Sequence, residues 1–186
     1  TSARQERPCS VTRSPSCLGV SAFKPETSIV RNIGQGLIIA VIALVLEQVT
    51  KWIILEHVMT PPRVIDVTGF FNLVLVYNRG VSFGLFGDGA VSALVLKAVA
   101  MVVVAGLIWW MRQAHDLLVR VALGLVVGGA IGNIIDRAVH GAVVDFLDFH
   151  VAGYHWPAFN VADSAIVIGV GLLLWDAFRM RKQTDA

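Results

Sequence analysis

Charge is scarce in this sequence. Only 15% of its 186 residues are Asp, Glu, Lys or Arg, whereas hydrophobic residues make up 56%. A soluble domain usually carries about 25% charged residues. This composition therefore excludes an ordinary soluble protein and indicates an integral membrane protein. The chain also lacks a basic stripe with interleaved aromatic residues, so nothing in it supports nucleic-acid binding.

Cysteine is absent from most of the chain, because Cys9 and Cys17 both lie near its start. The hydrophobic body therefore supports neither a disulfide framework nor a cysteine metal site. The five histidines form no HxxxH or HExxH pattern. We accordingly expect no metal site and no cofactor.

Four apolar runs are long enough to cross a bilayer. A spanning helix needs about 17–25 mostly apolar residues, and helix is the default because lipid cannot satisfy an open backbone. We expect the spans at residues 36–55, 90–111, 117–135 and 162–178. The third carries Gly124, Gly128 and Gly132, whose four-residue spacing predicts a close helix-packing face.

The residues outside the spans differ in composition from one another. Residues 1–31 are rich in Ser, Pro, Arg and Thr and predict a disordered, basic extension. The membrane domain then runs over residues 32–182, followed by a tail at 183–186. Residues 59–89 alternate between apolar and polar positions before a glycine-rich stretch, which predicts a small β-sheet.

The positions of Lys and Arg predict the orientation. The connection between the second and third spans holds Arg112 and Arg120, and the C-terminal tail holds Arg179, Arg181 and Lys182. The positive-inside rule then places both termini in the cytoplasm. The other two connections face the opposite side, so we expect the sheet to be extracytoplasmic and to rest on the outer leaflet.

Two aspartates stand out among the acids near the spans. Asp145 has apolar neighbours on both sides, and such surroundings raise the pKa of a carboxyl group. Asp163 opens the fourth span, where helix capping is the structural alternative. Acids near hydrocarbon usually mark a function, and two of them at one surface suggest paired-carboxylate chemistry.

The remaining acids have more ordinary interpretations. Glu47 and Lys51 are spaced to pair along one helix face. Asp136 adjoins Arg137, and a neighbouring cation would keep its carboxylate charged and tied down. We expect Asp148 to be solvated.

Five short motifs recur in the order and at the spacing of one known family. They are Glu47-Gln48-Val49-Thr50-Lys51, Asn78-Arg79-Gly80-Val81-Ser82-Phe83, Gly128-Gly129-Ala130-Ile131-Gly132-Asn133-Ile134-Ile135-Asp136-Arg137, Val143-Val144-Asp145-Phe146 and Phe159-Asn160-Val161-Ala162-Asp163. Each is weak alone, but five in order are highly specific. Over residues 36–178 the chain resembles the lipoprotein signal peptidases, the type II signal peptidases of bacteria.

The resemblance implies an all-α integral membrane protein with four transmembrane helices and a small extracytoplasmic β-sheet. It implies an aspartic endopeptidase of the bacterial inner membrane, with its active site near the outer surface. The substrates would be diacylglyceryl-modified prolipoproteins, cut just before the lipidated cysteine. We expect a monomer that contacts these substrates and membrane lipid, and no nucleic acid.

The resemblance also implies roles for individual residues. Asp145 and Asp163 match the catalytic aspartates, and Asp136 is the alternative partner. The residues that match polar groups lining the site or supporting it are Asn78, Asn133, Arg137, Asn160, Lys51 and Glu47. The family usually has Asp at the position of Glu47, although the longer side chain keeps the charge and can still reach Lys51.

Two other classes of function stay open from the residues alone. A small proton-linked carrier could use Asp145 and Asp163 as relay acids. Transporters often show internal repeats, and none is visible in this sequence. A non-enzymatic membrane scaffold would tolerate Asp-to-Asn changes at both positions.

Overall fold

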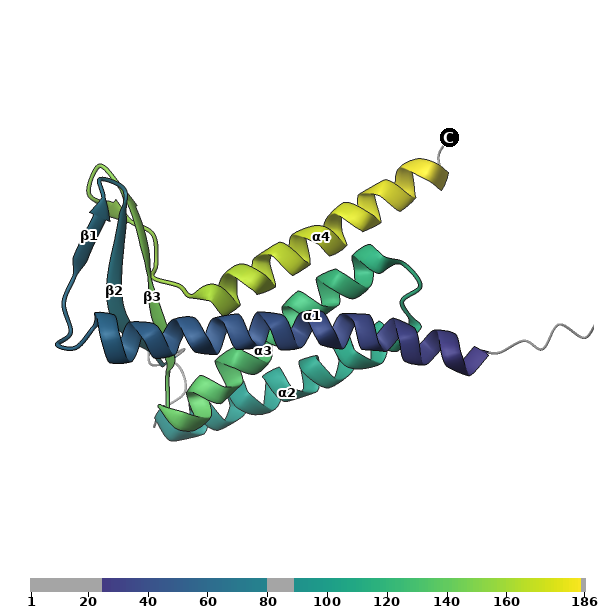
Figure 1. The fold of residues 1–186 in the computed structure, drawn as a ribbon, viewed down its shortest axis with the longest axis horizontal. Helices are drawn as coiled ribbons and strands as arrows, with labels where there is room; N and C mark the ends of the chain where they lie inside the picture. The colour runs from purple at the N-terminus through teal and green to yellow at the C-terminus, as the bar shows by residue number, and fades with distance from the viewer. Residues whose placement is uncertain (1–24, 80–88, 185–186) are drawn as a thin grey trace, which may run out of the picture.

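Four long helices and a small sheet make up the computed structural model, which describes residues 25–79 and 89–184 (Figure 1). Its elements are α1 (Pro25–Ile53), the π-helical turn η1 (Ile54–Val58), β1 (Ile65–Thr68), β2 (Phe71–Asn78), α2 (Gly89–Gln113), α3 (Leu117–Val139), β3 (Val143–Val151), β4 (Tyr154–His155) and α4 (Val161–Thr184). All four helices are long and apolar enough to cross a membrane. The predicted fold class is therefore confirmed.

The helices are longer than the apolar runs that predicted them. α1 begins at Pro25, so residues 25–31 are helical and the expectation of disorder is wrong for that part of the extension. Proline suits the first turn of a helix, because no intrahelical bond is lost there. Residues 1–24 lie outside the described residues. α3 and α4 likewise continue to Val139 and Thr184, because hydropathy marks the apolar part of a helix and not its ends.

α3 is the central helix of the bundle and contacts the other three. Of its apolar window, 56% is buried inside the protein, compared with 11% for α2. Gly124 and Gly128 make the approach to α1 possible, because a Cβ there would lie 2.5 Å from Gly36 O and 2.4 Å from Ala40 O. The predicted packing face is confirmed for these two glycines.

The sheet has the order β1-β2-β3-β4, and all its strand pairs are antiparallel. β1 and β2 come from the connection that was predicted to form strands. β3 and β4 come from the connection between α3 and α4, which was not predicted to do so. The two-residue turn between them has positive φ at Ala152 and Gly153, as tight hairpin turns require.

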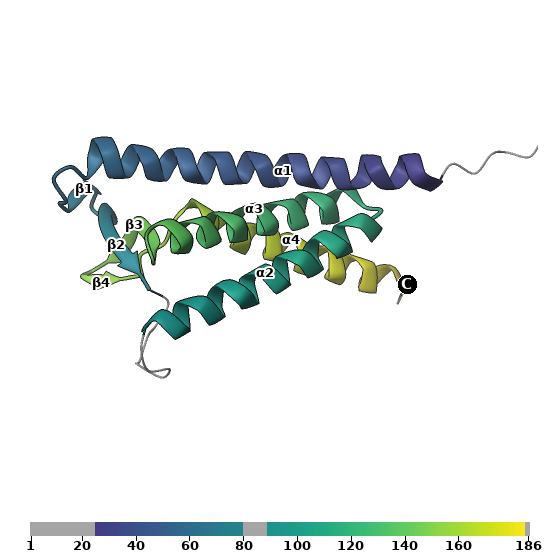
Figure 2. The ribbon, with the colours of Figure 1, turned by 90° about the horizontal axis from the view of Figure 1, so that it is seen from below.

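The sheet lies at one end of the bundle, beyond the last turn of α1 and the first turn of α4 (Figure 1). The start of α1 and the end of α4 both lie at the opposite end, and the view in Figure 2 agrees. α3 passes into β3 through Gly141, whose φ of +70° permits the sharp turn. The end of α3, the start of β3 and the start of α4 are thereby brought together.

The connection between α2 and α3 is tied by a buried arginine. Arg120 donates to the carbonyl oxygens of Ala114 and His115, at 3.2 and 2.6 Å, and to Gln35 Oε1 on α1, at 3.1 Å. Arg120 therefore holds α1 and the α2–α3 turn together, in addition to its place in the charge pattern.

Candidate active site

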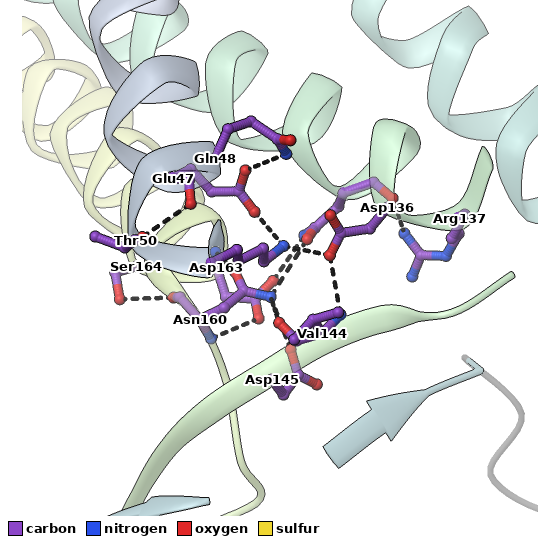
Figure 3. Close-up of polar contacts among 12 residues, drawn as sticks. Glu47, Gln48, Thr50, Asp136, Arg137, Val144, Asp145, Asn160, Asp163 and Ser164 are labelled. Atoms are coloured by element: carbon purple, nitrogen blue, oxygen red, sulfur yellow. Dashed lines mark hydrogen bonds and ion pairs between the residues drawn. The ribbon is translucent and has the colours of Figure 1, made fainter. Parts of the chain in front are cut away.

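The residues expected at the site converge where the bundle meets the sheet, and Figure 3 labels six of them: Glu47, Asp136, Arg137, Asp145, Asn160 and Asp163. All the expected residues come from α1, β2, α3, β3 and the start of α4. The set comprises Glu47, Lys51, Asn78, Asn133, Asp136, Arg137, Asp145, Asn160 and Asp163. From Gly80 on, the motif that begins at Asn78 lies outside the described residues.

Asp163 is held by a capping arrangement at the start of α4. The backbone N–H of Asp163 donates to Asn160 Oδ1 at 3.0 Å, and the backbone N–H of Asn160 donates to Asp163 Oδ2 at 3.3 Å. This reciprocal pair satisfies two donors at the helix end. Asn160 is thus the residue that caps the helix, and Asp163 keeps a second oxygen, Oδ1, which accepts from Asn133 Nδ2 at 2.9 Å.

Asp145 lies on β3 and is only 1% exposed. Its Oδ1 accepts from Asn160 Nδ2 at 2.7 Å, and its Oδ2 accepts from Asn78 Nδ2 at 3.0 Å. Asn160 therefore bonds Asp145 through its side chain and Asp163 through its backbone. The two acids share this one residue as a neighbour.

Burial raises the pKa of Asp145 above its ordinary value, and the nearby carboxylate of Asp163 raises it further. The hydrogen bonds from Asn78 and Asn160 and the charge of Lys51 act in the opposite direction without cancelling the rise. In the part of the chain that the structure describes, neither Asp145 nor Asp163 forms an ion pair. The two acids are therefore coupled to each other and not neutralised by a cation.

Asp136 has a different environment, and its cation is not the one expected. Lys51 Nζ lies 2.5 Å from Asp136 Oδ2, whereas Arg137 donates instead to the Asn133 carbonyl oxygen at 3.2 Å. Adjacent residues on a helix do not face each other, so the expected Asp136–Arg137 pair was wrong. Asp136 Oδ2 also accepts the backbone N–H of Val144 at 2.9 Å.

The pair between Glu47 and Lys51 on α1 is confirmed. Lys51 therefore lies between two carboxylates, those of Glu47 and Asp136, and all three side chains are buried. Gln48 adds a hydrogen bond from Nε2 to Glu47 Oε2 at 2.7 Å. These groups form an ionic cluster, and Figure 3 shows Glu47 and Asp136 near Asp145 and Asp163.

Asp148 is buried, so the expectation that it is solvated was wrong. It is 6% exposed, and both its oxygens lie within 3.0 Å of His155 Nδ1. Asn72 Nδ2 donates to Oδ2 at 3.2 Å. Asn72 lies on β2 and His155 on β4, so the two strands that flank β3 enclose this carboxylate.

An open groove of about 530 Å³ reaches Asp163. Its walls are mostly apolar and come from the segment before α4 and the first turns of that helix. The lining residues are Trp156, Pro157, Ala158, Phe159, Asp163, Ser164, Val167 and Ile168. Sequence reasoning missed this groove, although the spacing of Ser164, Val167 and Ile168 after Asp163 places them within two helical turns of it.

Metal-dependent chemistry has less support in this region. Across residues 25–79 and 89–184, no group of three or more His, Cys, Asp or Glu side chains is placed to hold a metal ion. The side chains available for catalysis at this site are the paired acids and the amides that bond them. General acid–base catalysis is the chemistry that such a pair can perform.

Comparison with known proteins identifies the family of this chain. Residues 39–179 match the family described as signal peptidase (SPase) II. The chain is 46% identical over 148 residues to the lipoprotein signal peptidase of Azoarcus sp. (strain BH72), covering 78% of this chain and 84% of that protein. It is 47% identical over 148 residues to the lipoprotein signal peptidase of Rhodopseudomonas palustris (strain TIE-1), covering 76% of this chain and 90% of that protein.

A solved structure gives the same result for the fold. It is a bacterial membrane enzyme determined by the in meso method at 1.9 Å resolution. Its sequence is 32% identical, the TM-score is 0.70, and the match covers 78% of this chain and 93% of that one. The family match and the identity to the curated relatives both extend over most of the chain. The chain therefore belongs to the signal peptidase II family.

Proposed function

We propose that this membrane peptidase is an aspartic endopeptidase whose catalytic pair is Asp145 and Asp163. Its substrates are diacylglyceryl-modified prolipoproteins, cut just before the lipidated cysteine. The observation that carries the proposal is the shared neighbour of the two acids. Asn160 bonds both carboxylates, while the described residues place no cation on either.

The pair can hydrolyse an amide without a metal. The ionised carboxylate takes a proton from water as the water oxygen attacks the scissile carbonyl carbon. The protonated carboxylate bonds the carbonyl oxygen and then gives its proton to the leaving amine as the C–N bond breaks. Two neighbouring carboxylates cannot both ionise at low cost, which favours one protonated and one ionised acid. The titration belongs to the pair, and neither residue has a fixed role.

Asp136 is the weaker candidate for the second acid. Its Oδ2 is occupied by Lys51 Nζ and by the backbone N–H of Val144. These contacts tie the carboxylate to α1 and to the backbone of β3 and leave this oxygen no free position for a substrate. We therefore assign Asp136 to support of the site.

Arg137 fits a role in holding the substrate backbone, whereas the amide residues hold the two acids. Arg137 Nε is buried, and in the described part of the chain it has no hydrogen-bond partner. Buried donors are nearly always paired, so a substrate carbonyl is a suitable acceptor. Asn78, Asn133 and Asn160 hold the two acids.

The proposed orientation places the active site at the outer surface of the bacterial inner membrane. The basic residues Arg179, Arg181 and Lys182 lie at the end of α4 that is opposite the sheet. The positive-inside rule then supports cytoplasmic termini. The groove beside Asp163 has mostly apolar walls, which suits a substrate that arrives within the bilayer.

The test is a cleavage assay on the wild-type protein in liposomes, with a prolipoprotein supplied with and without its diacylglyceryl group. We expect only the lipidated form to be cut, with mass spectrometry finding a product that begins at the lipidated cysteine. Proton flux across the liposome membrane without any cleavage would instead support the carrier that the acids alone left open.

A further inference from the structure

We propose that Glu47 is a positioning residue that lies in a notch created by Gly132 and acts on Asp145 through Lys51 and Asp136. The inference rests on the proposed catalytic role of Asp145. It concerns a buried acid on α1 that lies outside the proposed catalytic pair.

Glu47 is completely buried and uses both carboxylate oxygens. Oε1 pairs with Lys51 Nζ, and Oε2 accepts from Gln48 Nε2 at 2.7 Å. Removing Lys51 would leave the buried charge of Glu47 without compensation, and removing Gln48 would leave Oε2 without its hydrogen bond. The carboxylate therefore has one favourable position.

Gly132 provides the space for that position. A Cβ at residue 132 would lie 2.7 Å from Glu47 Oε2 and 2.9 Å from Glu47 Cδ. The carboxylate of Glu47 thus occupies the space that the side chain of any residue other than glycine would need at position 132. Gly128 differs, because a Cβ there would lie 2.4 Å from the Ala40 carbonyl oxygen, which belongs to the main chain.

Three contacts lead from the notch to Asp145. Glu47 holds Lys51, and Lys51 Nζ lies 2.5 Å from Asp136 Oδ2. The same oxygen accepts the backbone N–H of Val144 at 2.9 Å. Val144 immediately precedes Asp145 on β3, so the position of Lys51 fixes the peptide next to the catalytic acid.

The size of residue 132 and the length of residue 47 are therefore coupled. In Gly132→Ala the new methyl group must displace the carboxylate of Glu47, which is the movable end of a side chain, and Lys51 moves with it. Shortening residue 47 with Glu47→Asp removes the methylene that brings the carboxylate into the notch. Glu47→Asp should therefore relieve the clash that Gly132→Ala creates.

The test is a double-mutant cycle on the full chain with a lipidated prolipoprotein. We expect Gly132→Ala to lower kcat by about 10-fold or more with KM nearly unchanged, since sub-ångström misplacement of catalytic groups carries losses of this order. In the Glu47→Asp background the same change should cost less than about threefold. Equal losses of kcat in the two backgrounds would overturn the proposal, because the free-energy effects of mutations at independent sites add.

Gly128→Ala is the matched control. Its methyl group meets main chain, so it should lower thermal stability by the same amount whether residue 47 is Glu or Asp. Should Gly132→Ala fail to accumulate as folded protein, Glu47→Asp must restore the folded yield. Failure of that restoration also overturns the coupling.

A second readout separates this inference from the proposed function. The amide resonance of Val144 should shift in Gly132→Ala and return in the double variant. If the resonance shifts and returns in this way but the wild-type protein cuts no prolipoprotein, the proposed function is rejected and the coupling between residues 47 and 132 stands. An unchanged resonance in Gly132→Ala would reject the coupling.

Discussion

At the residue scale, the partner of each acid decides what it can do. Asp136 and Glu47 share the ammonium of Lys51, so their charges are compensated. Asp145 and Asp163 are bonded by amides, which are neutral and leave the two charges to interact with each other. The sequence separated these two groups correctly, but it assigned Asp136 the wrong cation, because Lys51 is 85 residues away and only folding brings it near.

Removing the charge of Asp163 should lower the pKa of Asp145. The carboxylate of Asp163 is one of the causes that raise the pKa of Asp145, after burial. In Asp163→Asn, Asp145 should therefore lose its proton at a lower pH than in the wild type. Isotope-edited infrared titration of the aspartate carboxyl groups measures this shift.

Asp148→Asn is the control for that titration, because Asp148 is buried in the same strand but is not among the causes that shift the pKa of Asp145. It should leave the titration of Asp145 in place. An identical Asp145 titration in wild type and Asp163→Asn would contradict the coupling of the two acids.

Asn160 combines two tasks that substitutions can separate. Asn160→Ala removes the helix cap and the donor to Asp145, so we expect a stability loss of about 1 kcal/mol and loss of most cleavage activity. Asn160→Ser keeps a capping oxygen but is too short to reach Asp145 in the same way. Thermal unfolding should be nearly normal in Asn160→Ser while kcat falls, and normal kcat in this variant would contradict the bridging role.

At the element scale, the helices followed from hydropathy and the strands followed only in part. β1 and β2 were predicted from alternating apolar and polar residues. β3 was missed because its first residues are buried on both sides, and a strand of that kind lacks the alternation that predicts a half-buried one. The two residues of β4 are too few to show a pattern.

The missed strands explain the error at Asp148. Without β4, nothing in the sequence placed His155 beside this carboxylate, so solvent was the expected neighbour. The same limit applies to the groove beside Asp163, whose walls come partly from the segment between β4 and α4. These features depend on pairing between segments, which composition does not reveal.

The ionic cluster between α1 and α3 should contribute to stability only as a complete unit. Lys51→Met leaves the buried carboxylates of Glu47 and Asp136 without a cation, and breaking such a pair costs about 3–5 kcal/mol. We expect the loss to appear as a lower midpoint of thermal unfolding in detergent. The triple variant Glu47→Gln, Lys51→Met, Asp136→Asn should recover most of it, since no buried charge is left uncompensated.

A triple variant as unstable as Lys51→Met alone would contradict this account of the cluster. The result would then point to the packing of the Lys51 side chain rather than to its charge as the source of stability.

At the scale of the whole molecule, the sequence predicted four spans and the placement of both chain ends on the same side of the membrane. An even number of spans returns the chain to the side from which it started, and the structure has the two ends of the described chain at one end of the bundle. The convergence of α1, α3 and α4 on one site could not be derived from the residues alone. It depends on contacts such as those of Gly128 and Gly129, where helices approach a neighbour's main chain.

Cysteine labelling can test the proposed orientation. In a background with Cys9→Ser and Cys17→Ser, Tyr154→Cys in β4 and Lys182→Cys at the end of α4 provide single thiols at opposite ends of the bundle. Both parent side chains are exposed. A membrane-impermeant maleimide should label Tyr154→Cys in intact spheroplasts and Lys182→Cys only after permeabilisation. The reverse pattern would contradict the orientation.

The most direct measurement of the central claim is cleavage of a lipidated prolipoprotein by three Asp-to-Asn variants in liposomes. Asp145→Asn and Asp163→Asn should each fall to the uncatalysed background while inserting normally. Asp148→Asn, a matched change of a buried acid outside the pair, should retain activity. Normal processing by either Asp145→Asn or Asp163→Asn would contradict the assignment of the catalytic pair.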